Sequence, residues 1–172
     1  LLPPKWTEEL GRLRSNAEPV PFDEILPVIE QALGGPADTV FVDLEPTPLG
    51  AGSIAQVHRA RLRGGGAVVL KVRRPGIEAK IEADLRLLSH LARFVENEVP
   101  DARHFQPVRV VEEFHRSLMR ELDLAQEARN IERLARNFSG EPHVLIPHVY
   151  PQWTSEAMNV QEYIDGMNDE DV

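Results

Sequence analysis

The chain has 172 residues, of which 42% are hydrophobic and 27% charged, a balance typical of a globular domain rather than a disordered segment. Its formal net charge of -9 argues against unaided nucleic-acid binding, because phosphate contacts need clustered lysine and arginine side chains. The absence of cysteine excludes disulfides, thiolate metal sites and cysteine nucleophiles. No stretch approaches the roughly 20 apolar residues of a membrane-spanning helix.

Two short helices are predicted near the N-terminus, over residues 4–14 and 22–33. The first places Trp6, Leu10 and Leu13 at helical spacing, and the second has acidic residues in its first turn and Gly34-Gly35-Pro36 after its end. The chain begins without a methionine and ends in an acidic run, so we expect it to be a piece of a longer protein.

Three strands are predicted next, over residues 40–49, 54–62 and 67–73. Prolines at positions 46 and 48 interrupt the first, a triple glycine at 64–66 joins the second to the third, and Pro75-Gly76 ends the third. Two further short strands are predicted around residues 144–149 and 158–164. Together these segments indicate an antiparallel sheet.

Two long amphipathic helices are predicted between the third and fourth strands. In the first, apolar residues recur every three or four positions between residues 77 and 95. The second runs from about residue 108 to residue 138, and its apolar stripe slips at residues 121–124, where we expect a kink, a break or a change of packing partner. Strands followed by helices favour an α+β fold with the helices grouped on one side of the sheet.

The most informative segment is the glycine-rich run G-A-G-S-I-A-Q-V at residues 50–57, followed by the strand lysine Lys71. Glycine has no Cβ, so backbone N–H groups at Gly50 and Gly52 can approach phosphate oxygens, and Ser53 adds a hydroxyl donor. Protein kinases build the roof of their nucleotide site from such a loop and such a lysine. The loop by itself is equally compatible with a plain glycine hairpin.

Lys71 lies in an otherwise apolar strand, where a buried charge needs a carboxylate partner. Glu121, Asp123 and Glu127 cluster at the slip in the second long helix, but their spacing prevents all three from sharing one face. Glu127 lies beside the apolar stripe and is therefore best placed to face the sheet. The alternatives are a lysine at a sheet edge and acids on a solvated helix face.

The remaining polar residues predict no further chemistry. The six histidines show neither H-x-x-x-H nor H-E-x-x-H spacing, so no metal site is predicted. Ser53 has no nearby histidine and aspartate pattern, and the sequence contains no G-x-x-x-x-G-K-[ST] motif.

Several strings taken together resemble the UbiB/ADCK family of atypical kinases, over nearly the whole chain. They are LLPP at 1–4, PLGAGSIAQVH at 48–58, KVRRPGI at 71–77, ADLRLL at 83–88, ELD at 121–123, EARN at 127–130 and EYIDG at 162–166. The resemblance implies a helical extension over residues 1–36 and a kinase-like N-lobe, including an extra helix, over residues 37–172.

The resemblance also implies roles for particular residues. Lys71 would be the nucleotide lysine and Glu127 its helix partner, and both are expected catalytic residues. Glu121 and Asp123 would form the family's E-x-D pair, which engages an N-terminal K-x-G-Q motif absent from this sequence. The expected nucleotide contacts are Gly50, Ala51, Gly52, Ser53, Val57 and Lys71, with Gln161, Glu162 and Tyr163 as the hinge beside the adenine.

The activity implied is that of an atypical kinase or ATPase linked to isoprenoid quinone (coenzyme Q) biosynthesis or lipid homeostasis. The expected cofactors are ATP, or another adenine nucleotide, and Mg²⁺ with its ligands outside this chain. Expected partners are quinone-pathway proteins or lipid precursors, in the bacterial cytoplasm at the inner membrane, with membrane association through parts outside this chain. The sequence has no H-R-D-like string and no D-F-G, so this chain alone is expected not to transfer phosphate.

Two alternatives remain open at this point. The chain could belong to a pseudokinase-like scaffold that binds lipid or protein partners without turnover, or to a phosphotransferase acting on small molecules such as aminoglycosides. The E-L-D string and the extra long helix argue against the second. Gly50 and Gly52 also depart from the alanine-rich loop typical of the family, which leaves the nucleotide preference open.

Overall fold

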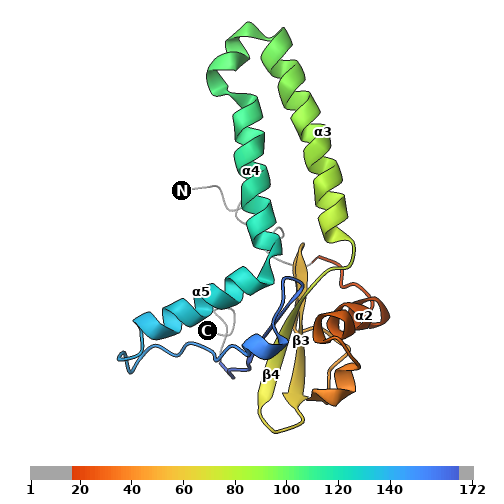
Figure 1. Ribbon diagram of the computed structural model, residues 1–172, viewed down its shortest axis with the longest axis vertical. Helices are drawn as coiled ribbons and strands as arrows, with labels where there is room; N and C mark the ends of the chain where they lie inside the picture. The colour runs from red at the N-terminus through yellow and green to blue at the C-terminus, as the bar shows by residue number, and fades with distance from the viewer. Residues whose placement is uncertain (1–16, 167–172) are drawn as a thin grey trace, which may run out of the picture.

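The computed structural model describes residues 17–166, in which helices surround a five-stranded antiparallel sheet. Helix α2 (Phe22–Leu33) packs on the sheet, and α3 (Ile77–Glu98) and α4 (Pro107–Leu122) form a hairpin that projects from one end of it (Figure 1). Helix α5 (Leu124–Asn137) leaves the foot of this hairpin in a different direction (Figure 1). The predicted α+β architecture is confirmed, whereas the helix predicted over residues 4–14 lies outside the described residues.

The sheet is built around the long hairpin of β3 (Ala55–Leu62) and β4 (Ala67–Arg73). The strand order is β1 (Phe41–Val42), β3, β4, β5 (Met158–Glu162), and β2 (Gly50–Ala51) also pairs with β3. Gly65 and Gly66 in the turn have φ values of 94° and 95°, a conformation that costs glycine little. The predicted β4 has the bounds that the sequence indicated, and β3 is one residue shorter.

Two predicted strands differ from the structure. Of the strand expected over residues 40–49 only β1 forms, and the separate β2 begins just after that range; Pro46 and Pro48, between them, cannot donate ladder hydrogen bonds. The strand expected around residues 144–149 is wrong, since only Val149 forms an isolated bridge, to Gln161. Pro147 has no N–H, so this segment contacts β5 through scattered hydrogen bonds, such as Tyr150 N–H to the Val160 carbonyl at 2.9 Å.

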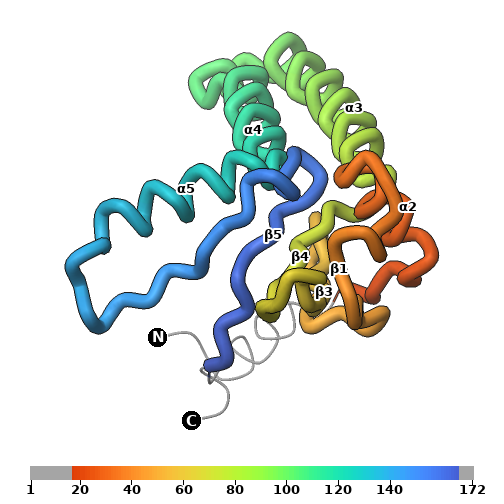
Figure 2. The backbone as a smooth tube through the Cα atoms, turned by 60° about the horizontal axis from the view of Figure 1, so that its bottom comes forward, coloured from red at the N-terminus to blue at the C-terminus, as the bar shows by residue number. Residues whose placement is uncertain are grey.

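The hydrophobic core lies between α2 and one face of the sheet. Alternate residues of the strands point to this face, and Val68, Leu70 and Val72 of β4 are fully buried there against Ile25 and Ile29 of α2. In Figure 2, α2 and α5 lie on opposite sides of the strands. The domain boundary expected at residue 36 stays a prediction, although α2 shares one core with the sheet.

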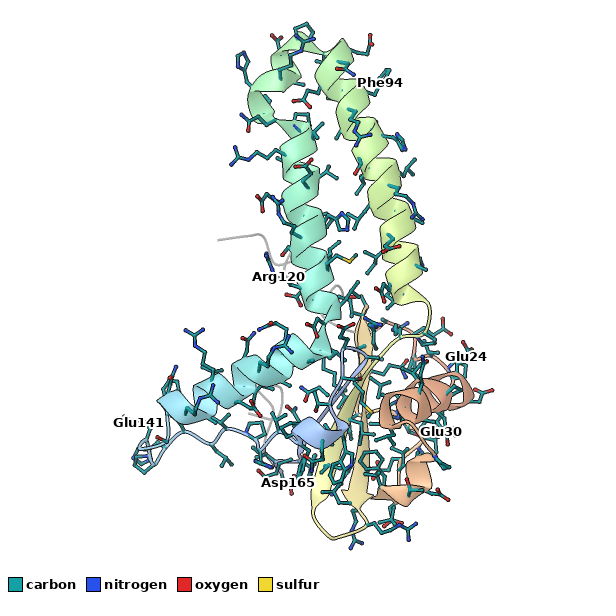
Figure 3. The ribbon with its side chains drawn as sticks, in the orientation of Figure 1. Glu24, Glu30, Phe94, Arg120, Glu141 and Asp165 are labelled. Carbon is teal, nitrogen blue, oxygen red and sulfur yellow. The ribbon has the colours of Figure 1, made fainter. Side chains whose placement is uncertain are left out.

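Helices α3 and α4 pack against each other through one stripe and leave further apolar side chains exposed. Leu85 and Ala92 of α3 are buried in the hairpin, whereas Leu87 is 71% exposed. Phe94 also points away from α4 (Figure 3). Within residues 17–166, none of the helices combines the length and apolar character needed to cross a membrane.

A buried polar cluster lies on the core side of β3. His58 and Gln56 are fully buried, and the His58 Nδ1 lies 2.9 Å from the Glu45 carbonyl oxygen, to which it donates. This leaves Nε2 of neutral His58 as an acceptor, 3.4 Å from the Gln56 side-chain nitrogen. The Gln56 amide also donates to the Val20 carbonyl at 3.2 Å and accepts from the Val20 N–H. The contact between Gln56 and His58 Nε2 therefore requires uncharged His58.

We expect this cluster to make stability depend on pH. Burial lowers the pKa of His58, although the hydrogen bond to Glu45 acts in the opposite direction. The unfolded chain therefore binds a proton first, so the contribution of His58 is complete above about pH 6.5 and declines as the pH falls, by at most about 1.4 kcal/mol per pH unit. Urea unfolding at pH 7.5 and 5.5 should show a smaller pH effect in His58→Gln than in wild type. Equal pH effects in the two proteins would contradict the prediction.

Candidate nucleotide site

The glycine loop (residues 50–57) and Lys71 lie against the same pocket, on the face of the sheet opposite the core. The loop connects β2 to β3, with Gly50 opposite Val57, and the Gly52 N–H closes it by donating to the Ala55 carbonyl at 2.9 Å. The pocket beneath has a volume of about 340 Å³. It is lined by Gly50, Ala51, Gly52, Ser53, Ile54, Ala55, Val57, Lys71, Glu121 and Leu124.

Lys71 forms the predicted ion pair with Glu127. Its Nζ lies 2.6 Å from Glu127 Oε2, and the two side chains are 34% and 38% exposed. An ion pair this exposed contributes little to stability, because solvent screens it and both side chains lose freedom. Its consequence is geometric, since it holds one amine at a defined place beside the glycine loop.

The break between α4 and α5 brings Glu127 to the sheet. Asp123 leaves the helical conformation, with φ -88° and ψ 91°, and its carboxylate accepts from the Gln126 N–H at 3.1 Å to cap α5. Leu122 and Leu124 are both buried on either side of it. The slip expected at residues 121–124 is thus a helix break, and Glu127 follows one turn after the cap.

The two acids expected to act as an E-x-D pair have different surroundings. Glu121 is exposed and lines the pocket with Lys71. Asp123 caps α5 and also accepts from Arg129 at 3.0 Å. Their engagement with a K-x-G-Q motif stays a prediction.

The expected hinge residues belong to the edge of the sheet beside this pocket but do not line it. Gln161 and Glu162 are the last two residues of β5. Gln161 is opposite Val69, whereas Lys71 is opposite Asn159, two residues earlier in β5. Tyr163 donates its backbone N–H to the Ala67 carbonyl at 3.0 Å, and its ring lies 4.3 Å from the Arg59 guanidinium. The structure therefore brings the loop, Lys71 and Glu127 together, and the expected hinge residues lie at the end of β5, outside the pocket lining.

Sequence reasoning missed Asn159. This residue is directly opposite Lys71 in the β4–β5 register and is fully buried, and both polar atoms of its amide lack a hydrogen-bond partner among residues 17–166. Buried amides without partners are uncommon in native proteins, and each calls for an explanation such as a water, an ion or a functional role. A polar residue in the apolar β5 run, two positions before Gln161, was the available signal.

A larger surface pocket, of about 770 Å³, lies elsewhere, between α2 and the start of α3. Its two arginines are already engaged, Arg73 with Glu78 at 3.0 Å and Arg74 with the Gly52 carbonyl at 2.8 Å. We therefore assign the candidate site to the pocket of about 340 Å³ beneath the glycine loop, because Lys71 is one of its lining residues. Among residues 17–166 no cluster of three or more histidines, aspartates and glutamates could hold a metal ion.

Comparison with known proteins identifies the family of the chain. The chain is 45% identical over 174 residues to the probable protein kinase UbiB of Sodalis glossinidius, and 41% identical over 173 residues to that of Aliivibrio fischeri. Both alignments cover the whole chain but 32% of the relative, so the chain spans about a third of the length of these relatives.

A solved structure and a family model agree with these relatives. The complex of Rv3197 with erythromycin from Mycobacterium tuberculosis superposes with a TM-score of 0.76 at 27% identity, over 98% of this chain and 41% of the other. The model of the ABC1 atypical kinase-like domain matches residues 12–172. The UbiB proteins are similar to this chain over its whole length. The chain therefore belongs to the ABC1 atypical kinase-like family.

Proposed function

We propose that this chain forms one wall of the ATP site of a UbiB-like atypical kinase or ATPase, with the phosphates between the glycine loop and Lys71. The observation that carries the proposal is the 2.6 Å ion pair between Glu127 and Lys71, the lysine that lines the loop pocket. An ammonium group held in one place is a point charge suited to phosphate oxygens.

The glycine loop supplies further donors. The N–H groups of Ser53 and Ile54 have no acceptor among residues 17–166, and both residues line the pocket. Successive backbone N–H groups in a turn form an anion-binding concavity. The side chains of Val57 and Leu124 add apolar surface to the same pocket.

The residues present fit a nucleotide better than a metal ion. Lys71 and the loop N–H groups would bind and orient a triphosphate, whereas the described residues contain no acidic cluster that could hold Mg²⁺. Mg²⁺, when bound, would neutralise phosphate charge, and its ligands would come from outside residues 17–166. The link to isoprenoid quinone biosynthesis is part of the proposal and is supported by the similarity to the UbiB proteins.

Thermal unfolding with and without nucleotide tests the proposal. ATP at 100 times its Kd should stabilise the folded protein by about 2.7 kcal/mol. For a chain of this size, that corresponds to a rise in Tm of roughly 5–10 °C. Tripolyphosphate at the same charge concentration is the control for unspecific anion binding. A Tm that ATP does not raise would contradict the proposal and favour a scaffold without nucleotide.

A further inference from the structure

One guanidinium connects the glycine loop to the segment that precedes α2. Arg74 Nε donates to the Gly52 carbonyl at 2.8 Å, and Arg74 Nη2 donates to the Glu18 carbonyl, also at 2.8 Å. The backbone of Arg74 contributes as well, because its N–H donates to the Ile54 carbonyl at 2.8 Å. Arg74 is therefore bound to the loop at two places and to the N-terminal segment at a third.

A second side chain fastens the same segment close by. The fully buried Gln56, near the start of β3, binds both backbone groups of Val20, accepting from the N–H and donating to the carbonyl at 3.2 Å. Residues 17–20 are thus bound at Val20 to a side chain of the glycine loop itself, Gln56, and at Glu18 to Arg74, which also binds the loop. Both side chains bind backbone atoms of this segment, so the contacts fix the path of its backbone and do not depend on which side chains it carries.

The contact at Gly52 has a direct consequence for the phosphate donors. The peptide unit between Gly52 and Ser53 is planar and trans, so its carbonyl and its N–H point in opposite directions. When Arg74 holds the Gly52 carbonyl, it also fixes the direction of the Ser53 N–H. That N–H is one of the two donors without an acceptor at the pocket. Arg74 does not line the pocket itself, so its hydrogen bonds can affect a ligand there only through the loop.

We propose that Arg74 is a positioning residue that couples docking of residues 17–20 to the phosphate-binding shape of the glycine loop, with Gln56 completing the attachment. This inference rests on the proposed nucleotide site. Coupling of this kind is reciprocal: a nucleotide that orders the loop strengthens attachment of the segment, and a factor that pulls the segment away weakens nucleotide binding. Residues 17–20 would thereby be a point at which sequence or partners preceding α2 influence the site.

Amide hydrogen exchange without nucleotide tests the physical connection. The variants are Arg74→Ala, and Arg74→Lys, which keeps the charge but loses the fork that reaches two carbonyls. Both should accelerate exchange in the loop and at the Val20 N–H. The matched control is Arg63→Ala, because Arg63 also donates two guanidinium hydrogen bonds to a carbonyl, that of Asp38, away from the loop. It should leave loop exchange unchanged.

ATP titration of the same variants tests the functional consequence. Both Arg74 variants should raise the Kd for ATP roughly 2- to 10-fold, the effect of losing one neutral-acceptor hydrogen bond. Saturating ATP should slow exchange at Val20 in wild type and not in Arg74→Ala. Arg74→Lys equal to wild type in both measurements would overturn the proposal, because charge alone would then suffice.

The two measurements separate this inference from the proposed function. If ATP binds to none of the proteins, the proposed function fails, and loop exchange still decides whether Arg74 connects the loop to the segment. If exchange rises at Val20 but not in the loop, the coupling is overturned even where ATP binds. Circular dichroism shows whether each variant is folded. If Arg74→Ala does not fold, the more conservative Arg74→Lys supplies both the exchange and the ATP measurements.

Discussion

Replacing Lys71 with alanine should weaken ATP binding about 10- to 150-fold and abolish any ATP hydrolysis by the protein that carries this chain. The expected range is that of one charge-assisted hydrogen bond, about 1.5–3 kcal/mol. Lys71 is the amine on the wall of the glycine-loop pocket, and Glu127 holds it there at 2.6 Å. Isothermal titration with ATP gives the affinity, and phosphate release gives the activity.

The fold should survive this substitution. The Glu127 carboxylate that loses its partner is 38% exposed, so water can solvate it and the cost to stability is small. Lys80→Ala is the matched control, because Lys80 is an exposed lysine of α3 outside the pocket. It should bind ATP as wild type does. If Lys71→Ala also bound and hydrolysed ATP like wild type, the role assigned to Lys71 would be refuted.

Replacing Leu70 with alanine should lower the free energy of unfolding by about 2–5 kcal/mol, more than any other substitution considered above or below. Leu70 is fully buried at the centre of β4, in the core that α2 closes with Ile25 and Ile29. Removing its side chain forfeits apolar burial and leaves a cavity between sheet and helix. Urea unfolding monitored by circular dichroism should show a lower midpoint with a similar slope.

The control for this prediction is another leucine in a different environment. Leu87 of α3 is 71% exposed, and alanine is at least as good a helix former as leucine. Leu87→Ala should therefore change the free energy of unfolding by no more than about 0.5 kcal/mol. Similar losses in both variants would contradict the prediction, because they would mean that Leu87 is as well covered in the folded protein as Leu70.

The candidate site was predictable as far as residue type and periodicity carry information. A lysine within an apolar strand demands a carboxylate, and only a helix acid beside an apolar stripe can face a sheet, which selected Glu127. The same stripe, by slipping, indicated the break that the structure places at Asp123. In each case a local pattern selected the candidate residue, because burial and helical periodicity depend on neighbouring residues on the chain.

Other parts of the site depended on contacts between distant segments. Nothing in the local sequence distinguishes Arg74, which binds carbonyls 22 and 56 residues away, from its neighbour Arg73, which pairs with Glu78. The burial of Asn159 opposite Lys71 follows from the pairing of β5 with β4, two strands separated by the whole helical hairpin. Residues 144–149 have strand-like composition, but their backbone meets β5 at too few positions to form a ladder.

The sequence by itself determined the β3–β4 hairpin, the long helices, the glycine loop and the need of Lys71 for an acid, because each arises from spacing and burial along a short stretch. Only the tertiary structure decided that Glu127 meets Lys71 at 2.6 Å, that Asp123 caps α5, and that Arg74 joins the loop to the segment before α2. The physical reason is that backbone carbonyls are identical at every residue. A side chain that binds one therefore leaves no signature at its partner's position, and the contact exists only once the fold brings the two together.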